Sequence, residues 1–128
     1  MKRLLVFVLV LVLLITACGK DEFAYTDNGN PGQIKAFVFV DSNQNGVLDS
    51  GEKKLPTKVS ISQEVSCPPT SQPTWVDTDA NGEYLFDKLK PGKYCVIQLS
   101  DYNITSKMTP MVYVSSDTTT VVTWTVAP

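Results

Sequence analysis

Short runs of β-branched and aromatic residues alternate with polar, turn-forming residues along most of the chain. In 58–65, for example, Val59 and Ile61 alternate with Lys58, Ser60 and Ser62, which is the period of a half-buried strand. Beyond residue 32, no stretch repeats apolar residues at helical spacing. We predict seven strands, at residues 33–40, 58–65, 75–78, 83–87, 93–99, 110–115 and 119–127.

The segments between these runs carry strong turn signals. Asn81-Gly82 is typical of a β-hairpin, Pro91-Gly92 marks a second turn, and residues 66–73 contain three prolines that favour a stiff loop. Short strands at this spacing are typical of two packed sheets. We therefore predict an all-β fold, an antiparallel seven-stranded β-sandwich with a transthyretin-like or immunoglobulin-like layout.

The first residues have a different pattern. A positive start, Met1-Lys2-Arg3, precedes an apolar run at 4–15 that is shorter than the roughly 20 residues a spanning helix needs. This predicts a signal helix of a secretory signal peptide. Residues 15–18, Ile-Thr-Ala-Cys, resemble the bacterial lipobox, which implies cleavage before Cys18 and attachment of lipid to its thiol. Acyl chains would then hold the protein at a membrane.

Three regions follow from these patterns. Residues 1–17 are predicted to be a lipoprotein signal peptide, 18–32 the lipidated cysteine and a flexible polar tether, and 33–128 the β-sandwich domain. The expected location is the cell envelope, outside the cytoplasm, on the outer membrane or the cell surface. The expected partners are the membrane, through the lipid on Cys18, and a protein or an envelope polysaccharide.

Charge and composition narrow the function. Removing residues 1–17 leaves 9 basic residues against 13 acidic ones, a net charge of −4. An acidic chain without a basic patch is a poor nucleic-acid ligand. The chain has no histidine, so the commonest general base and the commonest transition-metal ligand are missing. We do not expect an enzyme.

Cys67 and Cys95 remain once Cys18 is assigned to lipid. Disulfides persist in exported proteins, so we predict a Cys67–Cys95 bridge. The alternative is a pair of buried free thiols.

Residues 41–52 read D-S-N-Q-N-G-V-L-D-S-G-E and fit the calcium-loop pattern at each defined position. Alternate side chains of a curled loop point their oxygens at one centre, and Gly46 permits the sharp turn. Hard oxygen ligands in this number suit Ca²⁺. The predicted ligands are Asp41, Asn43, Asn45, the carbonyl of Val47, Asp49 and Glu52. The alternative is a solvated Asn/Gly turn.

A second acidic cluster comprises Asp77, Asp79 and Asn81. It begins like a calcium loop, but Lys88 stands where the closing Glu would be. A hairpin turn rich in Asp and Asn explains it more simply, with a second metal cluster as the alternative.

Two longer motifs resemble a known family. G-x5-V-F-x-D-x-N-x-N-G-x-x-D-x-G-E spans residues 32–52, and T-D-A-N-G-E-Y-L-F with L-K-P-G-K-Y-C-V follows at 78–86 and 89–96. These resemble the B-type domains of serine-aspartate-repeat surface proteins (SdrD B-like), which are related to the Cna-B-like, prealbumin-like modules of collagen adhesins and pilins. The resemblance implies a calcium-stiffened sandwich with a structural, spacer or adhesion role. Gln98 replaces the glutamate that promotes isopeptide formation in pilin-type relatives, so no such bond is expected.

Carbohydrate binding is the alternative function. Trp75, Trp124 and several tyrosines could stack against sugar rings, or both tryptophans could belong to the core of so small a domain.

Overall fold

The computed structural model describes residues 25–64, 66–106 and 111–128, so the predicted signal peptide, its helix and Cys18 lie outside the described residues. Within those ranges there is no helix long and apolar enough to cross a membrane. The described residues form eight strands: β1 (Gly32–Val40), β2 (Lys54–Leu55), β3 (Lys58–Ser62), β4 (Val76–Asp77), β5 (Glu83–Leu89), β6 (Gly92–Leu99), β7 (Met111–Val114) and β8 (Thr119–Val126). The all-β prediction is confirmed, with one strand more than expected.

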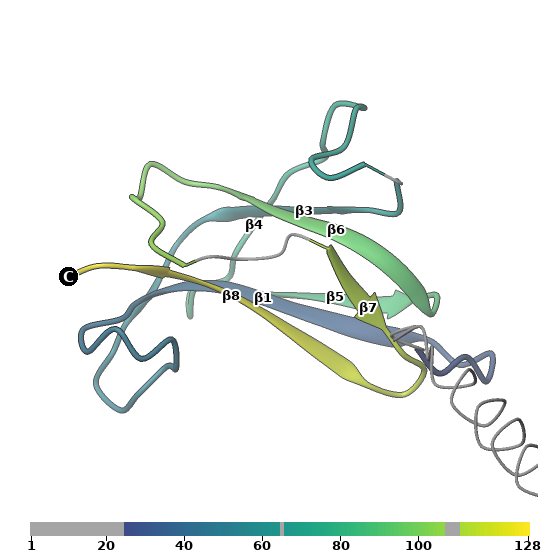
Figure 1. Cartoon of the computed structure of the whole chain (residues 1–128), viewed down its shortest axis with the longest axis horizontal. Coiled ribbons are helices and arrows are strands. Elements are labelled where there is room, and N and C mark those ends of the chain that lie inside the picture. Colours follow the sequence, from purple (N-terminus) through teal and green to yellow (C-terminus); the bar gives the residue numbers. More distant parts are fainter. Residues whose placement is uncertain (1–24, 65, 107–110) are drawn as a thin grey trace, which may run out of the picture.

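The strands form two facing sheets (Figure 1). In one sheet, β8 lies along one side of β1, while β5 and then β2 share its other side. The second sheet has the order β4-β3-β6-β7. The sandwich prediction is confirmed, and every strand pair is antiparallel except β1 with β8. That ladder is parallel because the chain reaches β8 from β7 of the opposite sheet rather than through a hairpin.

The hydrophobic core fills the space between the sheets. Strand alternation turns Ile34, Ala36 and Val38 of β1 inward, and the same alternation turns Val122, Trp124 and Val126 of β8 inward. The opposite sheet supplies the remaining buried members of this cluster, Val59, Tyr94, Val96 and Val114. Each sheet therefore turns an apolar face to the other sheet, as the alternating pattern requires.

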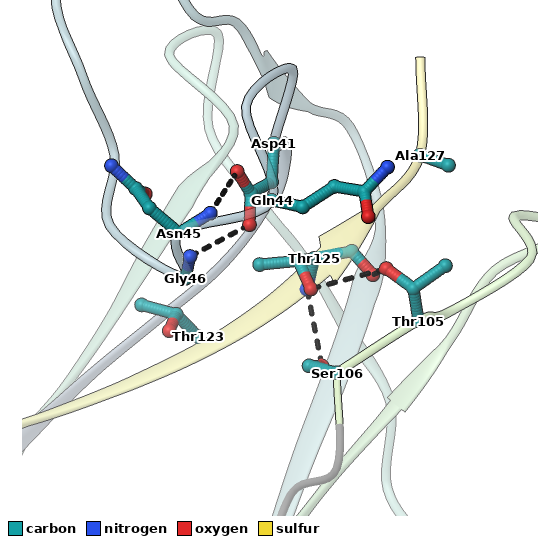
Figure 2. A pocket seen from close by; sticks show the side chains of 9 residues that line it. All are labelled: Asp41, Gln44, Asn45, Gly46, Thr105, Ser106, Thr123, Thr125 and Ala127. Carbon is teal, nitrogen blue, oxygen red and sulfur yellow. Dashed lines mark hydrogen bonds between the residues drawn. The ribbon is translucent and has the colours of Figure 1, made fainter.

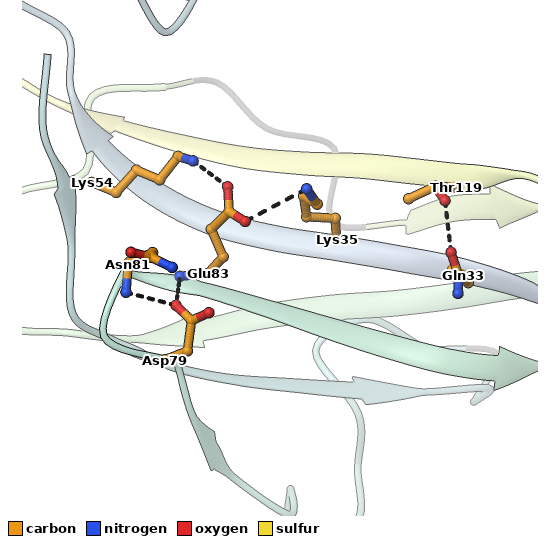
Figure 3. A network of polar contacts seen from close by, with 7 residues as sticks. All are labelled: Gln33, Lys35, Lys54, Asp79, Asn81, Glu83 and Thr119. Carbon is orange, nitrogen blue, oxygen red and sulfur yellow. Dashed lines mark hydrogen bonds and ion pairs between the residues drawn. The ribbon is translucent and has the colours of Figure 1, made fainter. Parts of the chain in front are cut away.

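Strand β1 also buries its other face. Phe37 and Phe39 are buried although they do not belong to the core cluster, and their ring centroids lie 6.1 Å apart. The Lys54 ammonium lies 4.7 Å from the centroid of the Phe37 ring and pairs with Glu83, which also pairs with Lys35 at 3.5 Å (Figure 3). The hydrogen bond from Lys54 lowers the pKa of the Glu83 carboxyl.

The segment before β1 is fastened to the β7–β8 turn. Backbone Thr26 accepts a hydrogen bond from the Ser116 amide at 2.8 Å, and the side-chain amides of Asn28 and Asn30 donate to Asp117 at 2.9 and 3.0 Å. Attachment to the fold thus begins before the predicted domain boundary at residue 33. Figure 1 places the start of β1 at one end of the sandwich, and the loop after β1 at the other end with the C-terminus.

Replacing Gly32 by alanine is expected to lower the free energy of unfolding by about 1–3 kcal/mol, because the added methyl group would be forced against Val114 and Ser115. A Cβ atom at Gly32 would lie 2.5 Å from Val114 Cγ1 and closer still to the Ser115 carbonyl oxygen. Urea unfolding of the variant measures the loss. Pro31→Ala, at the exposed neighbouring position, is the control, and equal stability of Gly32→Ala and the parent chain would contradict the contact.

Candidate functional site

The predicted ion loop connects β1 to β2. Its first ligand, Asp41, is only 5% exposed, and its carboxylate accepts hydrogen bonds from the amides of Asn45 at 3.1 Å and Gly46 at 2.8 Å (Figure 2). Gly46 has φ +76°, a left-handed conformation that glycine adopts without steric cost. The loop therefore curls back at the residue that the pattern assigns to the turn.

Three further predicted ligands meet at one atom. The side-chain amides of Asn43 and Asn45 both donate to Asp49 Oδ2, at 2.8 and 2.7 Å. The Asn43 and Asn45 side-chain oxygens in turn accept the backbone amides of Asn45 and Val47, at 3.2 and 2.7 Å. The predicted ligands are thus neighbours, but the nitrogens of the two carboxamides face Asp49 and their oxygens face backbone amides.

Glu52 closes the loop. Its two carboxylate oxygens accept the backbone amides of Ser42 at 2.7 Å and Asp49 at 3.0 Å, so one side chain joins the two ends of the segment. Val47, the predicted carbonyl ligand, is 59% exposed. Half-buried Leu48 follows it.

The donor set fits a hard cation. Three carboxylates and two carboxamides offer oxygen only, which is the chemistry that Ca²⁺ prefers. Among the described residues, however, no three acidic, cysteine or histidine side chains gather closely enough to hold a metal alone. Asp41 and Glu52 are turned to backbone amides instead. Amide and carbonyl oxygens would have to complete the coordination shell.

The second acidic cluster has separate partners. Asp77 pairs with Lys58 at 2.8 Å, whereas Asp79 accepts the amides of Asn81 and Glu83 at 2.8 and 3.0 Å (Figure 3). Asp79 therefore stabilises the tight turn at Asn81-Gly82. The predicted β-hairpin is wrong, because β4 pairs with β3 in one sheet and β5 pairs with β1 in the other.

A polar cleft adjoins the ion loop. It measures about 630 Å³ and lies between the loop, with Asp41 and Gln44, and a group of hydroxyl side chains on and beside β8 (Figure 2). These hydroxyls belong to Thr105, Ser106, Thr123 and Thr125. The sequence reasoning missed this cleft, although the outward threonines at alternate positions of 119–127 were a usable signal.

The structure joins Cys67 to Cys95 by a disulfide with Cα atoms 5.5 Å apart. Among the aromatic residues considered for sugar stacking, Trp124 is 6% exposed and Tyr94 is also buried in the core. The core alternative is thus correct for Trp124. Trp75 is half-buried.

Comparison with known proteins identifies one matching family, the SdrD B-like domain, over residues 32–126. Two curated proteins of Dictyostelium discoideum are similar over part of the chain. Colossin-B is 37% identical over 71 residues, and Colossin-A is 35% identical over 80 residues. The alignments cover 49% and 56% of this chain but only 2% and 1% of those proteins.

Two solved structures are similar at low identity. They are GBS52, the minor pilin of Streptococcus agalactiae (TM-score 0.49, 17% identity), and the Bacillus anthracis TIE protein (TM-score 0.48, 15% identity). Each match covers 77% of this chain, together with 44% of the first protein and 16% of the second.

Proposed function

Because the chain belongs to the SdrD B-like domain family, we propose that it is a cell-surface module with a structural, spacer or adhesion role, stabilised by Ca²⁺ and held to a membrane by lipid on Cys18. The observation that carries the proposal is the family match, which runs along the whole sandwich from β1 to β8 and includes the ion loop.

The lipid anchor is supported by the sequence before the sandwich. Residues 15–18 have the lipobox pattern, and six residues separate Cys18 from Tyr25. An extended chain spans at most about 3.6 Å per residue, so this linker would keep the fastened end of the domain within roughly 25 Å of the lipid. The ion loop, at the opposite end, would face away from the membrane.

Calcium is supported by the ion loop itself. Asn43 and Asn45 lie within hydrogen-bonding distance of Asp49, so turning their carboxamides would bring oxygens beside that carboxylate. Asp41 and Glu52 stand at the two ends of the segment. When bound, the ion would neutralise the carboxylates and cross-link the loop. Asp41 would contribute from the end of β1 and Glu52 from the residues that lead into β2, so binding would stabilise the sheet edge.

Calcium at 10 mM is expected to raise the free energy of unfolding by about 1.4–2.7 kcal/mol if Kd lies at the 10⁻⁴–10⁻³ M typical of extracellular calcium modules. For a domain of this size, that is a rise in Tm of roughly 6–20 °C. Thermal melting of the purified chain with Ca²⁺, Mg²⁺ or chelator measures it.

Glu52→Gln is expected to lose most of this rise, because it removes a charged oxygen ligand while keeping the side-chain shape. Asp79→Asn, in the turn between β4 and β5, is the matched control and should retain it. A Tm that is indifferent to Ca²⁺ and to chelator would refute the ion site.

A further inference from the structure

A second pocket lies where β3 begins and β6 ends, at the end of the sandwich opposite the start of β1. Its volume is about 530 Å³, within the range of small-ligand sites. Strand register brings its parts together, since Lys58 pairs across the sheet with Leu99 of β6 and Asp77 of β4. The pocket thus combines three neighbouring strands with the chain that follows β6.

Two of the residues that line this pocket are apolar and exposed. Tyr102 is 36% exposed and Leu99 is 53% exposed, and both line the cavity. Most of the large apolar side chains among the described residues are instead buried or partly buried in the core. An exposed aromatic ring that lines a cavity can offer a flat apolar surface to a ligand.

Other residues that line the pocket are charged or polar. Lys58 Nζ holds Asp77 Oδ1 at 2.8 Å, and the exposed Asp101 adds a second carboxylate. Thr57 also lines the pocket and is buried. Its amide donates to Thr78 Oγ1 at 3.0 Å, and its hydroxyl donates to the Leu99 carbonyl at 3.1 Å. These two bonds join Thr57, which precedes β3, to Thr78 after β4 and to Leu99 at the end of β6.

We propose that this pocket binds a neutral saccharide. A pyranose ring has an apolar C–H face, which would pack on Tyr102 and Leu99, and a rim of hydroxyls, which would donate to Asp77 and Asp101 and accept from Lys58. The two carboxylates outnumber the one ammonium, so the pocket disfavours acidic polysaccharides. This inference rests on the proposed surface role, and it places the ligand site at the end of the domain remote from the anchor.

Affinity electrophoresis of the full chain tests this, with native gels containing dextran, mannan or xylan and a non-ionic detergent that lacks a sugar headgroup. At least one polysaccharide should retard the chain. Tyr102→Ala should weaken the apparent affinity about tenfold, whereas Tyr102→Phe keeps the ring and should keep most of the affinity. Asp77→Asn should also weaken retardation. Tyr113→Ala, an exposed tyrosine on β7, is the matched control and should have no effect.

The proposal is overturned if none of the three polysaccharides retards the chain, or if Tyr102→Ala is retarded as strongly as the parent. It is also overturned if the chain instead binds poly-lysine in a way that Tyr102→Ala weakens and salt abolishes, because the pocket would then be a site for cationic peptides. Calcium-dependent melting is independent of all these results, so failure of the pocket remains distinguishable from failure of the calcium-stabilised module.

Discussion

Replacing both Cys67 and Cys95 by alanine is expected to lower the free energy of unfolding by about 3–4 kcal/mol, the value that loop-closure entropy gives for a bridge across a separation of 28 residues. The bridge attaches the proline-rich loop after β3 to Cys95 of β6, a residue with no exposed surface. Urea unfolding of the variant measures the loss, and for this domain size Tm should fall by roughly 15–25 °C.

Reduction of the parent chain is the matching experiment without mutation. A reducing agent should lower the Tm of the parent but leave the double alanine variant unchanged. Equal stability of the parent and the variant under oxidising conditions would mean that the bridge does not restrict the unfolded chain.

Trp124→Ala is expected to cost about 3–5 kcal/mol, because it removes the largest side chain of the core and leaves a cavity between the sheets. Val121→Ala lies on the same strand at a position that is 57% exposed, and it should change stability by less than about 0.5 kcal/mol. Urea unfolding of both variants measures the contrast. Comparable losses would contradict the assignment of which face of β8 is buried.

Local sequence signals were sufficient for seven of the strands. Each combines β-branched or aromatic residues with a turn signal at its ends. The Asn81-Gly82 turn forms as expected, but it connects β4 of one sheet to β5 of the other and does not make a hairpin, a partition between sheets that local sequence does not encode. Strand β2 escaped prediction because it contains only Lys54 and Leu55 and is followed at once by Pro56. Its pairing with Val38 and Phe39 depends on the return of the ion loop, a tertiary effect with no local signature.

The candidate functional residues also fall into two groups, those that local sequence spacing predicts and those that only the tertiary fold brings together. The ion loop is contiguous, so spacing alone brought Asp41, Asn45 and Glu52 into one prediction. The two pockets combine residues from distant segments, such as Tyr102 beside Asp77, and only the sheet register places them together. The burial of Trp124 likewise follows from the packing of β8 beside β1 in the completed sandwich.

The parallel pairing of β1 with β8 has a mechanical consequence. The ladder runs over eight residue pairs, from Gln33 with Thr119 to Val40 with Val126. Tension applied between the N-terminal end of β1 and the C-terminal end of β8 would pull the two strands past each other along their length. All the hydrogen bonds of the ladder would then resist in shear together, whereas an antiparallel hairpin pulled at its open end yields one bond at a time.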